Sequence, residues 1–170
     1  MLDFFYLDFR QAFDCVSHEI LLSKLNTYGI RGITLDWFSS YLTNREQYIC
    51  INNVDSNPRV IQCGVPHGSI FIPLLFLIFI NHLSRCSSQF KYIDCADDST
   101  LSICIPGNNV MDSAQLINSE LKWLNIWLKS NKISINADKT ENMLFSCNRN
   151  VNLLIIKIGN KKIKLLLRNF

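Results

Sequence analysis

An acidic turn between two apolar segments constrains the fold of this chain more than any other sequence feature. Residues 90–93 and 101–105 have the composition of buried strands, and Asp97 and Asp98 lie in the connection between them. Aspartate tolerates the backbone of tight turns, and a short connection joins neighbouring antiparallel strands. The pattern therefore predicts a β-hairpin, and an earlier aromatic run at residues 4–9 predicts a further buried strand.

The rest of the chain mixes helical and extended patterns without a regular βαβ order. A long amphipathic helix is predicted at residues 110–129, with a buried stripe supplied by Leu116, Leu121, Leu124 and Leu128. The other predicted helices span residues 19–28, 34–42 and 69–83. The other predicted strands span residues 47–52, 59–63, 141–147 and 153–158, the last followed by a turn at Gly159-Asn160. This mixture predicts an α+β fold in which an antiparallel sheet packs against helices.

Length and composition indicate a globular protein of one domain, residues 1–170, with 48% hydrophobic and 18% charged residues. The longest apolar run, residues 70–80, is too short to span a bilayer, and no segment resembles a secretory signal. The seven cysteines are odd in number and form no C-x-x-C pair, which disfavours a zinc site or a disulfide framework. We therefore expect no membrane segment, no secretion and a cytoplasmic or nuclear location.

The charge is distributed unevenly along the chain. Residues 1–121 contain 7 basic and 12 acidic side chains, whereas residues 122–170 contain 10 basic and 2 acidic side chains. An acidic first part suits cation binding, and a basic last part suits a polyanion such as nucleic acid. A solvated basic surface without a ligand explains the second part equally well.

Three aspartates are the candidates for chemistry. Asp8 follows the apolar residues of the first predicted strand, and Asp97 and Asp98 occupy the hairpin turn. Carboxylates brought together on neighbouring buried strands repel one another, so that one would take up a proton unless a cation is present. Two Mg²⁺ ions about 3.5–4 Å apart would remove the repulsion and create a site for phosphoryl transfer. Taken alone, the doublet is better explained by an ordinary turn.

Four motifs resemble those of reverse transcriptases from LINE-like (non-LTR) retrotransposons of the jockey type. They are LDFRQAFDCV at residues 7–16, GVPHGSI at 64–70, CADD at 95–98 and NADKT at 136–140. They stand in the family's order, and the connecting segments 18–32 and 37–45 also match. The recognisable motifs lie within residues 1–160.

The resemblance implies a polymerase palm with fingers and thumb largely missing, acting as an RNA-directed DNA polymerase. Its implied partners are an RNA template, a DNA primer and deoxynucleoside triphosphates, and its implied cofactor is a pair of Mg²⁺ ions, with Mn²⁺ as the alternative. The implied metal ligands are Asp8, Asp97 and Asp98, with the carbonyl of Phe9 as an extra ligand.

The resemblance also implies roles for neighbouring residues. Phe13 would lie under the incoming sugar and exclude a 2′-hydroxyl; its alternative is a core aromatic residue. The binding site for nucleotide and template would be lined by Gly64, Pro66, His67, Gly68 and Ser69. This segment could equally be a turn at the start of a helix. Lys139 would protonate the leaving pyrophosphate, or would be a solvated lysine at a strand end.

Departures from the family pattern leave a second function open. His67 replaces a glutamine of the second motif, and Cys95 replaces an aromatic residue beside the doublet. The two hypotheses are therefore an active polymerase domain and a catalytically inactive retrotransposon remnant that at most binds nucleic acid. A polymerase of the group II intron type is a third alternative, disfavoured by the LINE-like connecting segments.

Overall fold

The computed structural model describes residues 2–66, 68–95, 98–105, 110–146 and 155–169. Two compact units make up the chain. One combines Met1–Arg10 with Asn81–Phe170, and the other is Gln11–Ile80. We describe each unit by itself.

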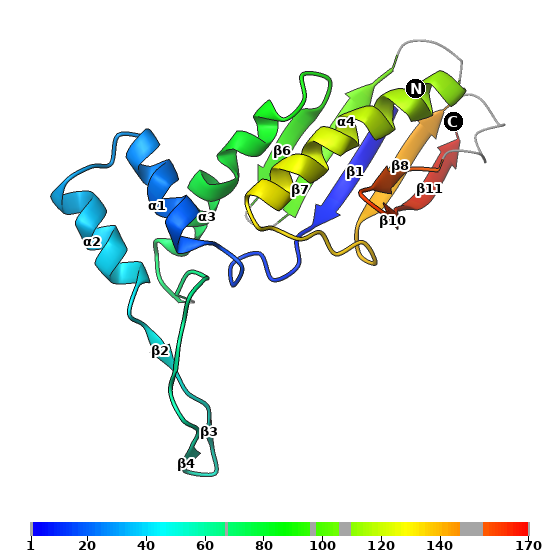
Figure 1. Ribbon diagram of the computed structural model, residues 1–170. Coiled ribbons are helices and arrows are strands. Elements are labelled where there is room, and N and C mark those ends of the chain that lie inside the picture. The colour runs from blue at the N-terminus through cyan, green and yellow to red at the C-terminus, as the bar shows by residue number, and fades with distance from the viewer. Residues whose placement is uncertain (1, 67, 96–97, 106–109, 147–154, 170) are drawn as a thin grey trace. The chain divides into compact units, whose positions relative to one another are not determined.

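The first unit is built on a five-stranded sheet (Figure 1). Its strands, in spatial order, are β11 (Lys164–Asn169), β8 (Glu141–Ser146), β1 (Leu2–Asp8), β7 (Asp98–Cys104) and β6 (Lys91–Cys95). β1 pairs antiparallel with both β7 and β8, and β6 pairs antiparallel with β7. The predicted α+β fold is confirmed, as is the antiparallel pairing of the two strands around the acidic doublet, although Asp98, predicted to lie in the turn, is the first residue of β7. Edge strand β11 was not predicted, and it runs parallel to β8.

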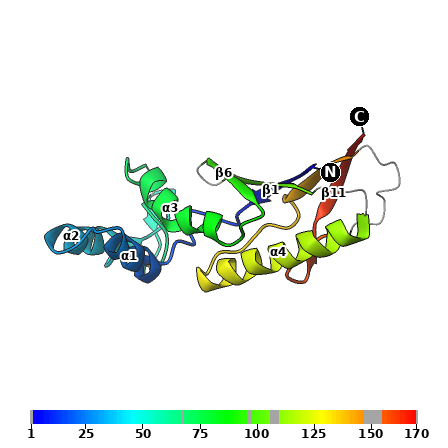
Figure 2. The ribbon, with the colours of Figure 1, turned by 90° about the horizontal axis from the view of Figure 1, so that it is seen from above.

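Helix α4 (Val110–Ser130) lies along one face of this sheet (Figure 2). The strands alternate accordingly: in β1, Asp3, Phe5 and Leu7 are buried, whereas Leu2 and Tyr6 are exposed. Burial of this apolar face is the main driving force for forming the unit. The buried apolar residues in the described part of α4 are Ile117, Leu121, Leu124 and Leu128. Leu116, predicted to lie in this stripe, is 37% exposed, because Ile117 takes the inward position.

A short hairpin follows the described part of β8. It consists of β9 (Lys157–Ile158) and β10 (Lys161–Lys162), and β9 contacts α4. Gly159 has a φ of +61° in the turn, a conformation that glycine adopts without steric cost. The predicted Gly159-Asn160 turn is therefore confirmed. Of the strand predicted at 153–158, residues 153–154 lie outside the described residues, and the described part is a strand only at Lys157–Ile158.

The second unit contains α1 (His18–Thr27), α2 (Ile33–Leu42) and α3 (Ile72–Ile80). α1 packs against both other helices. The helix predicted at 69–83 is shorter than expected, because Pro73 in the first turn favours a start at this point and a 3₁₀ segment, Asn81–Arg85, follows α3. Within the described residues, no helix is both long enough and apolar enough to cross a membrane.

Between α2 and α3 the chain forms a narrow two-stranded arm instead of two long strands. Its strands are only two residues each: β2 (Glu46–Gln47) pairs with β5 (Arg59–Val60), and β3 (Cys50–Ile51) pairs with β4 (Val54–Asp55). Every residue from 46 to 60 is exposed, so the arm lacks a core of its own. The predicted strands 47–52 and 59–63 are thus correct in position but interrupted.

Candidate functional site

The sheet register brings two of the three predicted aspartates together. Asp8, the last residue of β1, is the direct antiparallel partner of Asp98, the first residue of β7. Direct partners have Cβ atoms about 4.5–5.5 Å apart and project from the same face of a sheet. Asp97 lies outside the described residues.

Both carboxylates project from the face of the sheet that α4 does not cover. Along β1, residues 3, 5 and 7 are buried, so Asp8 falls on the other face together with Tyr6. Along β7, Ser99 and Leu101 are buried, which likewise leaves Asp98 on the open face. Asp8 is half-buried and Asp98 is exposed. Two of the three predicted aspartates therefore lie side by side, at a solvated end of the sheet rather than within a core.

The carbonyl end of β1 is held in place by the segment that follows α4. The Asp8 amide donates to Thr140 Oγ1 at 3.3 Å, and the Asn136 amide donates to the Asp8 carbonyl at 2.8 Å. One residue further, Phe9 forms a bridge with Ile135. The fourth motif thus packs directly beside the first motif. Sequence spacing alone gave no sign of this contact.

Lys139 lies in a tight turn of that segment. Its amide donates to the Asn136 carbonyl at 3.2 Å, and the Thr140 amide donates to the same carbonyl at 2.9 Å. Thr140 is fully buried, whereas Lys139 is exposed. The turn therefore fixes the backbone of Lys139 near the end of β1 and leaves its amine in solvent.

The donor set suits a hard divalent cation. Like charges directly opposite one another destabilise a strand pair, and a cation between Asp8 and Asp98 would relieve this repulsion. Mg²⁺ binds to a few carboxylates and completes its shell with water and substrate phosphates, which the open face admits. No group of three or more His, Cys, Asp or Glu side chains able to hold a metal is found within the described part of the chain, from which Asp97 is missing.

The other predicted site residues belong to the second unit. Phe13 is half-buried and its ring centroid lies 4.9 Å from that of Phe76, so this side chain has a packing role inside its unit. Gly64, predicted to allow close approach of a ligand, already meets the backbone of Asp14. A Cβ on Gly64 would lie 2.9 Å from the Asp14 carbonyl oxygen.

A buried histidine fixes the same segment. His18 Nε2 lies 2.8 Å from the carbonyl oxygen of Gly64, and the Gly64 amide donates to the Val16 carbonyl at 2.8 Å. Beyond it, Pro66 and Ser69 are half-buried and Gly68 is exposed, while His67 lies outside the described residues. The turn at the start of a helix, one of the two alternatives for this segment, is thus present.

Sequence reasoning missed an ionisable group in the core of the first unit. Asp3 is fully buried between the sheet and α4, and Asn142 Nδ2 donates to its Oδ1 at 3.0 Å. Burial raises the pKa of Asp3 to about 6, and the bond from Asn142 partly opposes this effect. Its position in the alternating pattern of β1 was the available signal.

The sequence is similar to a known protein family and to individual proteins of known type. A family model described as "Reverse transcriptase (RNA-dependent DNA polymerase)" matches residues 4–166. The chain is 30% identical over 155 residues to the probable RNA-directed DNA polymerase from transposon BS of Drosophila melanogaster. It is 24% identical over 147 residues to the RNA-directed DNA polymerase from mobile element jockey of the same species. Each match covers 83% of this chain, and the chain spans 16% of each relative's length.

Solved structures agree on the fold. The telomerase from Candida albicans, in a complex with a fragment of telomeric RNA, superposes with a TM-score of 0.62 at 14% identity, over 96% of this chain and 29% of the telomerase chain. The ordered motifs, the open-faced palm sheet and the match over residues 4–166 lead to one assignment. The chain belongs to the reverse transcriptase (RNA-dependent DNA polymerase) family, and within it to the LINE-like, non-LTR retrotransposon type.

Proposed function

We propose that this chain is the palm of an RNA-directed DNA polymerase and extends a primer 3′-hydroxyl with deoxynucleotides on an RNA template. The observation that carries the proposal is the direct pairing of Asp8 with Asp98 at the open end of the sheet. The whole of residues 1–170 would form this domain, with its motifs within residues 1–160. Family membership supports the reaction type.

Asp8 and Asp98, together with Asp97, would hold two Mg²⁺ or Mn²⁺ ions, and the Phe9 carbonyl would be an extra ligand. When bound, such ions neutralise phosphate charge and favour ionisation of the attacking hydroxyl. The contribution of the chain is positioning: the β1–β7 register and the backbone bonds of Asp8 to Thr140 and Asn136 fix the backbone that carries the carboxylates before substrate arrives.

The open face of the sheet would support the primer end. Tyr6 is 42% exposed and Ile93 is 63% exposed, and both lie on the face that carries Asp8 and Asp98. Exposed apolar side chains of this kind can contact sugars and bases. Lys139 is proposed to donate a proton to the leaving pyrophosphate, since its turn holds it near the end of β1.

Phe13 and residues 64–69 are proposed to contact the incoming nucleotide. Phe13 would select deoxynucleotides by excluding a 2′-hydroxyl, and Gly64, Pro66, His67, Gly68 and Ser69 would line nucleotide and template. The packing of Phe13 on Phe76 and the close approach of Gly64 to Asp14 support a rigid segment of fixed shape.

Primer extension on an RNA template tests the proposal. Asp98→Asn should reduce extension by at least about 100-fold, because it removes a charged ligand of the metal ions that would stabilise the transition state, and Asp97→Asn should behave alike. Asp36→Asn, an exposed acidic position in α2, is the matched control and should retain activity. Equal extension by wild type and Asp98→Asn would refute the proposal.

The second candidate function is nucleic-acid binding without catalysis. It is favoured by the excess of basic residues in 122–170 and by the changed motif positions His67 and Cys95. Its signature is salt-dependent RNA binding by wild type and Asp98→Asn alike, with no extension by either.

A further inference from the structure

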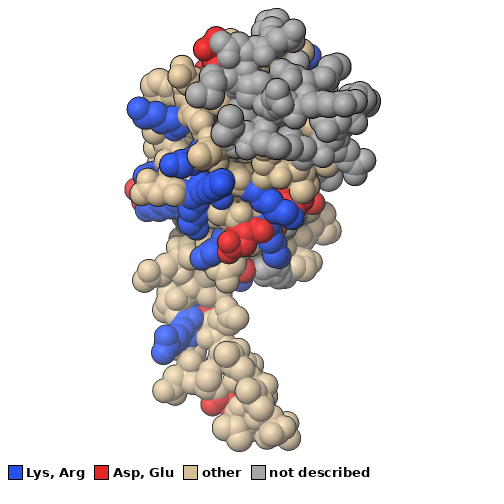
Figure 3. All heavy atoms as spheres, turned by 90° about the vertical axis from the view of Figure 1, so that its right-hand side faces the viewer, with Lys and Arg blue, Asp and Glu red and all other residues tan. Residues whose placement is uncertain are grey.

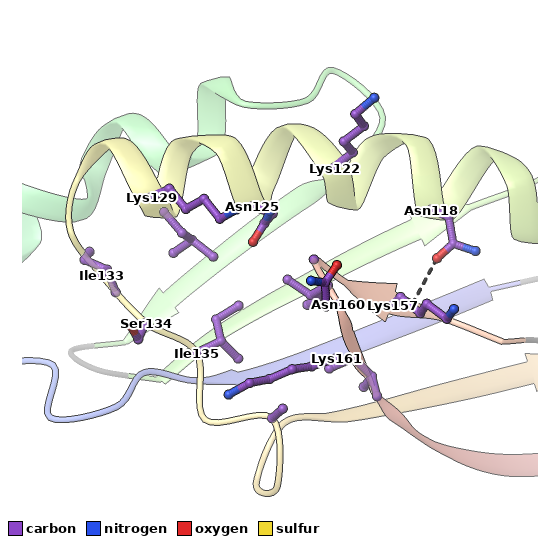
Figure 4. Close-up of a pocket in the computed structure, with 15 residues that line it drawn as sticks. Asn118, Lys122, Asn125, Lys129, Ile133, Ser134, Ile135, Lys157, Asn160 and Lys161 are labelled. Carbon is purple, nitrogen blue, oxygen red and sulfur yellow. Dashed lines mark hydrogen bonds between the residues drawn. The ribbon is translucent and has the colours of Figure 1, made fainter.

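A basic cavity lies on the α4 side of the first unit, between this helix and the β9–β10 hairpin (Figure 4). Its volume is about 660 Å³. The wall is formed by α4, by the segment 133–137 and by the hairpin. Because Asp8 and Asp98 project from the uncovered face of the sheet, this cavity is separate from the proposed polymerase site.

The walls of the cavity are fixed by direct contacts. Asn118 Nδ2 donates to the Ile155 carbonyl at 3.0 Å, and its Oδ1 accepts from the Lys157 amide at 3.0 Å. Gly159 approaches Asn125 so closely that a Cβ would lie 3.0 Å from Asn125 Oδ1. Two asparagines of α4 thus hold the hairpin in place, and the cavity exists before a ligand binds.

The lining combines an aliphatic floor with a cationic rim. The floor consists of buried Leu128, Ile133, Ile158 and Ile163. The rim contains Lys122, Lys129, Lys157 and Lys161, and no aspartate or glutamate is among the described residues that line the cavity. Figure 3 shows one face of the protein on which Lys and Arg side chains gather, with fewer Asp and Glu side chains among them. An uncompensated group of lysines around a cavity favours an anionic ligand.

The lysines of the rim differ in the direction of their side chains. Lys129 runs along the underside of α4 toward Asn125, and Lys161 extends below Ile135, whereas Lys122 points away from the hairpin (Figure 4). Asn160 reaches into the space between helix and hairpin. Lys129 and Lys161 are therefore the cations best placed to contact a ligand, and the asparagine amides offer both donors and acceptors.

We propose that this cavity binds one phosphorylated nucleotide unit, with the phosphate held by Lys129 and Lys161. The sugar and base would lie over the aliphatic floor and bond to Asn125 and Asn160. The volume falls in the range of about 300–1,000 Å³ that small-molecule sites occupy. The unit is one residue of single-stranded RNA or a free nucleotide. The proposal goes beyond the polymerase function, since it requires no catalysis.

Fluorescence anisotropy with labelled single-stranded RNA tests the proposal, with adenosine monophosphate as competitor. Lys129→Gln/Lys161→Gln should weaken binding about tenfold at low salt and reduce the slope of log affinity against log salt by about 0.7 for each lost phosphate contact. The matched control, Lys132→Gln/Lys162→Gln, removes the same charge from exposed neighbours that do not line the cavity. This control should bind nearly as wild type.

Competition with adenosine monophosphate distinguishes RNA from a free nucleotide as the source of the ligand. If the ligand is RNA, millimolar adenosine monophosphate displaces it poorly, and affinity rises with RNA length. If the ligand is a free nucleotide, adenosine monophosphate alone raises the unfolding temperature of the wild type but not of Lys129→Gln/Lys161→Gln. The proposal would be overturned if the cavity variant and the control lost RNA binding equally. It would also be overturned if neither variant lost binding and adenosine monophosphate caused no thermal shift. Because Asp8 and Asp98 are intact throughout, failure here leaves the polymerase proposal untouched.

Discussion

At the scale of single residues, Asp3 has the clearest energetic consequence. Its Oδ2 and the Oδ1 of Asn142 are buried, and neither atom has a hydrogen-bond partner among the described residues. Protonation of Asp3 removes a buried charge and converts one of its carboxylate oxygens into a donor. The neutral form of Asp3 is therefore the one that suits the fold.

Asp3 predicts a dependence of stability on pH. Its pKa rises from 3.8 to about 6 on folding, so the folded chain binds more protons between these values. The free energy of unfolding should fall as pH rises through this interval, by at most about 3 kcal/mol, and then level off. Asp3→Asn should remove the fall and stabilise the chain at pH 7. Urea denaturation at pH 4 to 7.5, followed by circular dichroism, measures this. A parallel pH profile for both proteins would contradict it.

Substitution by alanine should destabilise the chain more at Gly64 than at Gly68. Gly64 and Gly68 both have positive φ, at +89° and +84°, so alanine costs about 1 kcal/mol of backbone strain at each. Only Gly64 also lacks space, because of the Asp14 backbone. Gly64→Ala should therefore lower the free energy of unfolding by about 2 kcal/mol or more, and Gly68→Ala by about half of that. Urea denaturation of both variants decides this, and equal losses would show that strain alone matters.

At the scale of elements, Asn118 makes two hydrogen bonds that join α4 to the segment at the start of the β9–β10 hairpin. Asn118→Ala removes both bonds to the hairpin, which should cost about 1–3 kcal/mol and should increase hydrogen exchange at the Lys157 and Ile163 amides. Ser119→Ala, which alters the exposed neighbour, is the control. Unchanged exchange in Asn118→Ala would mean that apolar contacts alone hold the hairpin.

The sequence predicted the elements with long apolar runs better than the short ones. β1, β7 and α4 were located because burial on one face imposes a clear period on their residues. The arm between α2 and α3 was placed but not resolved into its short pairs, since every residue of it is exposed and burial imposes no pattern. β11 was missed, and its parallel pairing with β8 arises from tertiary contacts that local propensity does not encode.

The candidate site was predictable only in part, because tertiary contacts are not encoded in local sequence patterns. Asp8 and Asp98 were chosen from motifs and are now seen to be register partners. The contacts of Asp8 with Thr140 and Asn136 join residues more than 120 positions apart, and no local pattern announces them. The cavity beside α4 was equally hidden, although the basic last part of the chain indicated an anionic ligand.

At the scale of the whole molecule, the distribution of exposed apolar side chains predicts self-association. Tyr48, Ile49, Ile51, Val54 and Val60, all on the arm, are at least 58% exposed. Exposed apolar strands associate readily with other chains. Ile49→Thr/Ile51→Thr should reduce concentration-dependent association in sedimentation velocity, while circular dichroism and the unfolding temperature stay unchanged. Identical sedimentation of variant and wild type would exclude the arm as the cause.

The pairing of an aspartate with an aspartate across two antiparallel strands makes the proposed metal site sensitive to the length of the strands as well as to their composition. Side chains in a strand alternate between faces, so one inserted or deleted residue within β1 would turn its terminal carboxylate toward α4 and away from its counterpart. The hydrophobic alternation of β1 would be inverted at the same time. The packing of the sheet and the pairing of the two carboxylates therefore depend on the same number of residues in β1, and an insertion that disrupts one disrupts the other.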